Sequence, residues 1–182
     1  MDPQFQAFIA TSQDGYIARA DGAIDWLERP EYAIPGEDFG YAAFMAGIDL
    51  IAMGRASFEK VLDLNGWFYG STPVLVVCTA RDPAWSAPEG AVVRFTHDGI
   101  KGVMTEARAA GARGVYVDGG RLVSGFLRAG LLDRLIVTRL PVLLGSGIPL
   151  FSGLDRDIRL RLESSQSWPN GFEQSTFTVL RE

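Results

Sequence analysis

The residues best suited to chemistry in this chain follow a short apolar run, Leu50 to Met53. The run ends in Gly54-Arg55, and a segment with helical character, Ala56 to Leu62, comes next. A strand that passes through a glycine into a helix directs free backbone N–H groups at one spot, which attracts anions and most often phosphate. Arg55 adds a guanidinium suited to a phosphate monoester. The pattern therefore predicts a nucleotide cofactor held by backbone amides and an arginine, not by a lysine-bearing phosphate loop.

Two further strand ends carry residues of the same kind. Thr79-Ala80-Arg81 follows the apolar run Val74–Cys78, and Asp118-Gly119-Gly120-Arg121 follows Val115–Val117. Ligands of open α/β sheets bind beyond the carboxyl ends of the strands, where a hydroxyl and an arginine can receive a ribose phosphate. Paired glycines let a phosphate approach the backbone closely at the start of a helix. Together the three junctions indicate a dinucleotide site.

The elements that must position these residues alternate between strand and helix along most of the chain. Continuous apolar runs indicate strands buried on both faces, as in a parallel sheet, and two strands close the chain around an Asn-Gly turn. We expect one α/β domain over residues 1–182, with a mostly parallel central sheet, flanking helices and an antiparallel C-terminal edge. The expected strands are 5–11, 50–53, 74–78, 92–95, 115–117, 134–140, 158–167 and 172–180, and the expected helices are 38–47, 56–62, 100–110 and 121–129.

Composition and net charge argue against several classes of function. The chain has 182 residues, 47% of them hydrophobic, and a formal net charge of −5. The acidic balance argues against nucleic acid as a partner, since such proteins carry a basic surplus. The apolar runs are too short for a membrane span, and the first residues show no signal peptide. A single cysteine, Cys78, allows no internal disulfide, so a cytoplasmic location is expected.

Four segments make the chain resemble the dihydrofolate reductase superfamily. The resemblance is to the branch shared with the C-terminal reductase domain of the bifunctional riboflavin-biosynthesis deaminase-reductase. The segments are Phe8–Ala18, Asp49–Glu59, Val115–Leu132 and Pro141–Phe151. The last of them, with Gly-Leu-Leu-Asp at 130–133, is typical of the riboflavin-reductase-like branch. The resemblance implies that fold and an NADPH-dependent reductase acting on CH–NH or CH–OH groups.

The resemblance also implies which residues contact NADPH. The Gly-Arg-x-Ser segment would bind the cofactor phosphates, the residues after the next strand would flank the 2′-phosphate, and the double-glycine segment would lie along the pyrophosphate. Two residues near the first strand would contact the nicotinamide, and no metal is implied. The full set is Ala10, Ile17, Met53, Gly54, Arg55, Ser57, Thr79, Ala80, Arg81, Gly119, Gly120, Arg121 and Leu122.

A carboxylate in the helix before the Gly-Arg strand grips the amino-pyrimidine edge of the pterin in classical dihydrofolate reductases. Asp38, sixteen residues before Gly54, has a suitable spacing for this catalytic role. Capping is the alternative, because acidic residues are favoured where a helix opens. Asp38 can therefore be read either as a substrate-binding residue or as a helix cap.

Several departures from the family leave the substrate open. The chain lacks the zinc motif and deaminase domain of the bifunctional enzyme, and its aromatic residues Tyr41 and Tyr69, among others, could line a pocket for a flat ligand. We expect a small heterocycle, of pteridine or aminopyrimidine kind, as substrate. The alternatives are a same-fold reductase of a carbonyl or nitro compound and a dinucleotide-binding protein without turnover. The resemblance also implies a homodimer, with Leu140–Leu150 as a candidate contact.

Overall fold

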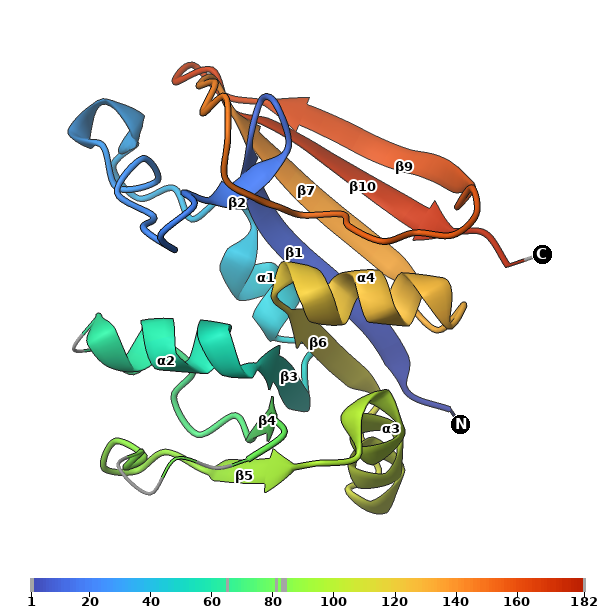
Figure 1. Cartoon of the computed structure of the whole chain (residues 1–182). Coiled ribbons are helices and arrows are strands. Elements are labelled where there is room, and N and C mark those ends of the chain that lie inside the picture. The colour runs from blue at the N-terminus through green and yellow to red at the C-terminus, as the bar shows by residue number, and fades with distance from the viewer. Residues whose placement is uncertain (1, 65, 81, 83–84, 182) are drawn as a thin grey trace.

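The computed structural model of the chain describes residues 2–64, 66–80, 82 and 85–181 (Figure 1). Within this part, an eight-stranded sheet has the order β5-β4-β3-β6-β1-β7-β10-β9, and β2 and β8 form a separate pair. The strands are β1 (Gln4–Ser12), β2 (Tyr16–Ala18), β3 (Leu50–Gly54), β4 (Val74–Val77), β5 (Val93–Thr96), β6 (Gly114–Asp118), β7 (Arg134–Leu140), β8 (Ile148–Pro149), β9 (Leu160–Ser167) and β10 (Glu173–Val179). The helices are η1 (Pro30–Tyr32), α1 (Tyr41–Met45), α2 (Arg55–Asp63), α3 (Gly99–Ala109) and α4 (Gly120–Arg128).

The sheet is parallel from β5 to β7 and antiparallel from β7 to β9. This confirms the mostly parallel sheet with an antiparallel C-terminal edge. The central strands β3, β4 and β6 have the continuous buried character expected when helices cover both faces. In β3, for example, Leu50, Ile51, Ala52 and Met53 are all buried.

Alternate residues of the central strands feed two cores on opposite faces of the sheet. On one face, Leu50 and Ala52 pack with residues of α3 and α4, including Val103 and Val123. On the other, Ile51 and Met53 pack with Phe44 of α1 and Phe58 of α2. A third cluster, around the buried Trp26, Tyr32, Leu140 and Phe172, joins the loop after β2 to the C-terminal hairpin. Helices α2 and α4 therefore lie on opposite faces of the sheet.

The first predicted helix was wrong in its bounds. Residues 38–47 contain only the five-residue α1, Tyr41–Met45. Phe39 (φ 57°) and Gly40 (φ 83°) before it adopt left-handed conformations, which a right-handed helix excludes. The side-chain amide of Gln174 donates a 2.9 Å hydrogen bond to the Phe39 carbonyl and so supports this turn from β10. A contact 135 residues away along the chain therefore helps to hold the turn that precedes the helix.

Two other local predictions have different outcomes. Asp14-Gly15 and Asp21-Gly22 bracket residues 16–18 and predict a loop beside the first strand, but these three residues form β2 and pair with β8. The turn between the last two strands is confirmed: Gly171 has a φ of 85°, and its N–H donates to the Trp168 carbonyl at 3.0 Å. An Asn-Gly pair can be recognised as a turn from local sequence, whereas β2 depends on a partner about 130 residues away.

Candidate functional site

The candidate site lies where neighbouring strands β3 and β6 end. The two strands are parallel, with Met53 opposite Asp118. The chain leaves β3 into α2 on one face of the sheet and leaves β6 into α4 on the other face. Such a reversal is a topological switch point, and ligands of open α/β sheets bind in the crevice outside the strand ends there. The structure thus brings the Gly54-Arg55 and Asp118-Gly119-Gly120 junctions together.

Both helices at this switch point begin without a side-chain cap among the described residues. Gly54 and Gly119 are their N-cap residues, and neither can offer a side-chain oxygen to the first N–H groups. The Arg55 side chain is 63% exposed and lies 3.9 Å from Glu59 at its nearest charged atoms, which is a weak surface pair. The start of α2 and the Arg55 guanidinium are therefore available to an anion, whereas at the start of α4 the Gly119 N–H bonds the Asp118 carboxylate.

The paired glycines allow a close approach of three segments. Gly119 has a φ of 92°, and a Cβ built on it would lie 2.7 Å from the Ser57 hydroxyl oxygen. A Cβ on Gly120 would lie 2.9 Å from the Pro149 carbonyl oxygen and 3.0 Å from the Ile17 Cδ1. Side chains at these positions would displace backbone or strain it. Ser57, Ile17 and both glycines, which sequence placed at one cofactor, thus lie together.

A strap formed by β2 and β8 runs along this side of the site. Asp14 anchors it, because its carboxylate accepts the Leu144 N–H at 3.1 Å and the Gly145 N–H at 2.7 Å. The Ser12 hydroxyl donates to the same carboxylate at 2.6 Å, and this bond, ahead of the two N–H groups, lowers the pKa of Asp14. The Gly-Ser-Gly loop at 145–147 is therefore held in place beside the site by Asp14.

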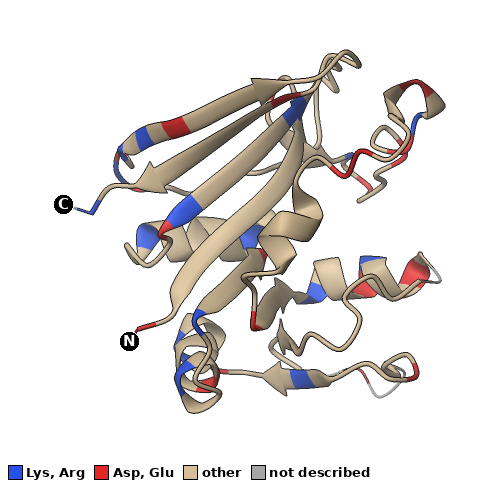
Figure 2. Cartoon of the chain, turned by 180° about the vertical axis from the view of Figure 1, so that it is seen from behind, with Lys and Arg blue, Asp and Glu red and all other residues tan. Residues whose placement is uncertain are grey.

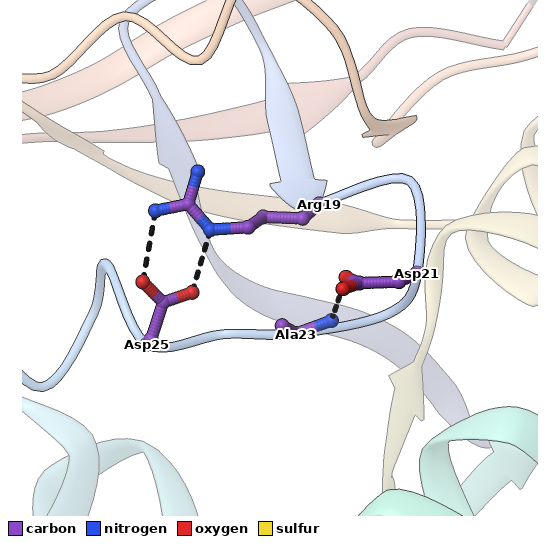
Figure 3. Close-up of polar contacts among 4 residues, drawn as sticks. All are labelled: Arg19, Asp21, Ala23 and Asp25. Carbon is purple, nitrogen blue, oxygen red and sulfur yellow. Dashed lines mark hydrogen bonds and ion pairs between the residues drawn. The ribbon is translucent and has the colours of Figure 1, made fainter.

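The loop after β2 closes on itself through charged contacts (Figure 3). Arg19 donates two hydrogen bonds to the Asp25 carboxylate, at 2.6 and 2.8 Å, and these lower the pKa of Asp25. Within the segment from Arg19 to Asp25, the Asp21 carboxylate accepts the Ala23 N–H at 2.9 Å. The fork of the guanidinium matches the two carboxylate oxygens and so fixes the shape of the turn. The loop lies beside the first strand, where sequence predicted it.

A partly buried carboxylate, Asp118, stands at the end of β6 among tyrosines. The Tyr116 hydroxyl lies 3.2 Å from its Oδ1 and 2.9 Å from the Phe8 carbonyl, and Ser57 also hydrogen-bonds the carboxylate. Burial raises the pKa of Asp118, although these hydrogen bonds oppose the shift. The Tyr116 hydroxyl can donate to the Phe8 carbonyl or to Asp118, and so holds the carboxylate in place at the end of β6.

The charge of Asp118 also affects the pKa values of two further tyrosines. Burial, with the charge of Asp118 second, raises the pKa of Tyr41 to about 12 and raises that of Tyr69 further. Tyr41 comes from α1 and Tyr69 from the loop before β4, and both pack against the core cluster that contains Tyr116. Sequence reasoning assigned the Asp-Gly-Gly turn to phosphate and missed this carboxylate. The sequence feature that could have indicated Asp118 is an acidic residue that follows an apolar run and precedes two glycines.

Asp38 caps the start of α1. Its two carboxylate oxygens accept the Gly40 N–H at 2.9 Å and the Ala42 N–H at 2.8 Å. The Ala42 bond, followed by the Gly40 bond, lowers the pKa of Asp38, so this carboxyl favours the ionised form. The capping alternative therefore has direct structural support, and the substrate-binding role of Asp38 stays a prediction.

The segment predicted to flank the 2′-phosphate follows β4. Thr79 and Ala80 are exposed there, and Arg81 lies outside the described residues. Cys78 before them is buried, as predicted, and burial raises the pKa of its thiol. The imidazole Nδ1 of His97 lies 2.9 Å from the Cys78 carbonyl oxygen, so it carries the proton of that hydrogen bond.

The remaining predicted cofactor residues differ in how far their side chains are buried. The side chains of Met53 and Leu122 lie in the two main cores, so only their backbone can face a ligand. The cofactor-binding roles of Met53 and Leu122 stay predictions. Arg121 is exposed in the first turn of α4, and Ala10 is half-buried beside the third cluster.

Comparison with known proteins identifies the family. The RibD C-terminal domain model matches residues 3–173 of the chain. The chain belongs to the RibD C-terminal domain family. The match spans both strand-to-helix junctions, the strap and Asp118.

Relatives of this RibD C-terminal domain are similar over nearly their whole length. The uncharacterized Bacillus subtilis (strain 168) protein YwjB is 32% identical over 170 residues, 92% of this chain and 94% of YwjB. A protein from Shewanella sp. PV-4, whose name links it to riboflavin biosynthesis, superposes with a TM-score of 0.82 at 31% identity. That superposition covers 98% of this chain and 99% of the Shewanella chain.

The fold extends to dihydrofolate reductase. The Enterococcus faecalis enzyme, solved with NADP(H), superposes with a TM-score of 0.60 at 17% identity, over 98% of this chain and 97% of the enzyme. The RibD C-terminal domain described here is therefore dihydrofolate reductase-like in fold, as the resemblance implied. In the described residues, no helix has the length and apolar character to cross a membrane, and no group of three or more acidic, His or Cys side chains is placed to hold a metal ion.

Proposed function

We propose that this protein is an NADPH-dependent reductase that delivers a hydride to an electron-poor carbon of a small heterocycle, of pteridine or aminopyrimidine kind. The observation that carries the proposal is the switch point between β3 and β6, where two uncapped helices begin on opposite faces of the sheet. Membership of a reductase family and the likeness to an enzyme solved with NADP(H) support it.

The residues at the switch point fit a dinucleotide. The N-cap glycines of α2 and α4 have no side chain to cap the first N–H groups, which can therefore receive a pyrophosphate, while the Gly119 N–H bonds the Asp118 carboxylate. We assign the phosphates to Gly54, Arg55, Ser57 and the N–H groups of 119–122, the 2′-phosphate to 79–81, and the nicotinamide to Ala10 and Ile17. Arginines at two of these positions, 55 and 81, favour NADPH over NADH.

The bound cofactor supplies the hydride, and the residues of the chain supply position and a proton. We propose Asp118 as the proton donor. Burial raises its pKa and so favours the protonated form, and Ser57 and Tyr116 fix its orientation. The substrate carbon accepts the hydride and the adjacent heteroatom accepts the proton. The reduced product therefore has the same charge as the substrate. Asp38, ionised and engaged by two N–H groups, is the poorer donor.

The proposal predicts consumption of NADPH with heterocyclic substrates. The purified protein is mixed with NADPH or NADH and with dihydrofolate, 5-amino-6-(5-phosphoribosylamino)uracil, an aldehyde or a nitroarene, and cofactor absorbance is followed. We expect turnover with a pteridine or the aminopyrimidine and a preference for NADPH. Turnover with only the aldehyde or nitroarene would establish the unrelated-substrate alternative. Tight NADPH binding without turnover of any compound would favour a dinucleotide-binding protein.

A further inference from the structure

His97, the only histidine of the chain, lies where β5 ends, directly after Thr96. β5 runs parallel to β4, with Val77 opposite Thr96, and β4 runs parallel to β3. The carboxyl ends of all three strands therefore meet at one edge of the sheet, where Arg55 and residues 79–81 are assigned to the cofactor phosphates. The sheet thus brings a histidine beside the candidate phosphate contacts.

The His97 ring lies on the face of the sheet that α2 covers. A Cβ built on Gly102 of α3 would clash with the Thr96 hydroxyl, so Thr96 points to α3 and the residue after it points to the opposite face. The His97 Nδ1 lies 3.9 Å from the Sγ of Cys78, which packs in the same core cluster as α2. Burial raises the pKa of this thiol, and the charge of Arg55 opposes the shift. Arg55 and His97 therefore approach the same corner of the sheet from two different elements.

A hydrogen bond to the backbone fixes which nitrogen of His97 can take up a proton. The Nδ1 donates to the Cys78 carbonyl oxygen at 2.9 Å, and a carbonyl can only accept, so the Nε2 of the neutral ring is unprotonated. His97 is exposed, and no hydrogen bond within the described ranges engages its Nε2. The neighbouring Asp98 is the N-cap of α3 and its Cβ lies toward Gly102, on the α3 side. The Nε2 can therefore accept a proton from solvent while the Nδ1 bond holds the ring in place.

We propose that His97 binds the 2′-phosphate of NADPH as an imidazolium, so that NADPH binding takes up a proton from solvent at the His97 Nε2. This inference rests on the proposed reductase function and adds a residue that selects between the two dinucleotides. A nearby negative charge favours the charged form of an imidazole, and the phosphate supplies that charge. NADH has a hydroxyl in its place and leaves the ring neutral. Arg55 opposes protonation of the ring by its own charge, so the uptake of the proton depends on the phosphate.

Proton NMR of the full chain measures the protonation of His97 directly. Because the chain has a single histidine, one Cε1 proton resonance reports on one ring. An acid titration of the free protein gives the position of the imidazolium resonance. Near neutral pH, saturating NADPH should move the resonance toward that position, and saturating NADH should leave it close to that of the free protein. A resonance that stays in place with bound NADPH, or moves equally with both dinucleotides, would overturn the inference.

His97→Asn separates the phosphate contact from the support of the strand end. The asparagine amide can still donate to the Cys78 carbonyl, as Nδ1 does, but nothing replaces Nε2. We expect the dissociation constant for NADPH to rise at least about fivefold, because a charge-assisted hydrogen bond is lost, and that for NADH to stay within about twofold. Fluorescence titration measures both constants, and thermal melts check that the variant stays folded.

Arg94→Ala is the matched control on the same strand. Figure 2 shows basic bands at the start of α2 and on β5, and the band on β5 is Arg94, which pairs with Glu106 of α3 at 3.3 Å and so lies on the other face. This variant should leave both affinities unchanged. Tight NADPH binding that His97→Asn does not weaken, or an equal loss for both dinucleotides, would overturn this inference alone. A wild type that binds neither dinucleotide would overturn the reductase proposal together with it.

Discussion

Asp118→Asn should lower kcat by about 10² to 10⁴, the range that a positioned general acid contributes. Asparagine keeps the size of the side chain but has no proton to give to the substrate. In the wild type, kcat should fall as the pH rises through the raised pKa of Asp118, and the variant should lose that dependence. Steady-state kinetics over a pH series measures both effects.

The same variant should be more stable than the wild type near neutral pH. Because burial raises the pKa of Asp118, the folded chain holds this proton more tightly than the unfolded chain does. Its stabilising contribution is complete below the ordinary pKa of 3.8 and is lost as the pH rises through the raised value. Asparagine carries no charge to bury, so the melting temperature should increase at neutral pH, and the gain should disappear in acid.

Asp38→Asn is the matched control for that loss of activity. It removes a charge from a capping carboxylate, and we expect kcat to stay within about tenfold of wild type because capping acts on the helix, not on the substrate. The reverse outcome, with Asp38→Asn inactive and Asp118→Asn active, would refute the assignment of Asp118. It would instead support the grip on an amino-pyrimidine edge that the superfamily resemblance implies for Asp38.

Gly119→Ala and Gly120→Ala should each weaken NADPH binding at least about tenfold and destabilise the fold by about 1–3 kcal/mol. At Gly119 the cause is the φ of 92° together with the Ser57 hydroxyl oxygen, and at Gly120 it is the Pro149 carbonyl oxygen. Fluorescence titration with NADPH and thermal melts measure the two effects.

Gly125→Ala in the same helix is the control for these glycine variants. A Cβ on Gly125 meets the end of the flexible Ile100 side chain at 3.1 Å, and its backbone is helical. We expect unchanged NADPH affinity and stability within about 1 kcal/mol of wild type, since alanine favours the helix. If Gly120→Ala behaved like Gly125→Ala, the close approach of the strap to α4 would have no part in cofactor binding.

The strand-to-helix junctions could be predicted because their signals are local. Apolar runs that end in Gly54-Arg55 and in Asp118-Gly119-Gly120 specify a strand, a turn and a helix start within a short stretch of chain. Parallel pairing then brings those junctions to one edge of the sheet. The position of the candidate cofactor site therefore follows from sequence pattern together with the rule for ligands at strand ends.

The parts that escaped prediction depend on distant contacts. The turn at Phe39 and Gly40 is held by Gln174 on β10, and the Phe39 ring packs edge-on against Trp168, with 5.2 Å between ring centroids. The burial that raises the pKa of Asp118 arises only where α1 and the loop before β4 meet β6. No local pattern encodes either arrangement, so sequence left Asp38 open between substrate binding and capping and overlooked Asp118.

Comparison of NADPH and NADH binding by fluorescence titration tests the central claim most directly. We predict tight NADPH binding, a weaker affinity for NADH, and a loss of about tenfold or more with Arg55→Ala, which removes the exposed guanidinium at the start of α2. Arg113→Ala, at the opposite end of β6, is the control and should change nothing. Failure of the wild type to bind either dinucleotide would contradict the reductase proposal and leave a dihydrofolate reductase-like fold without its chemistry.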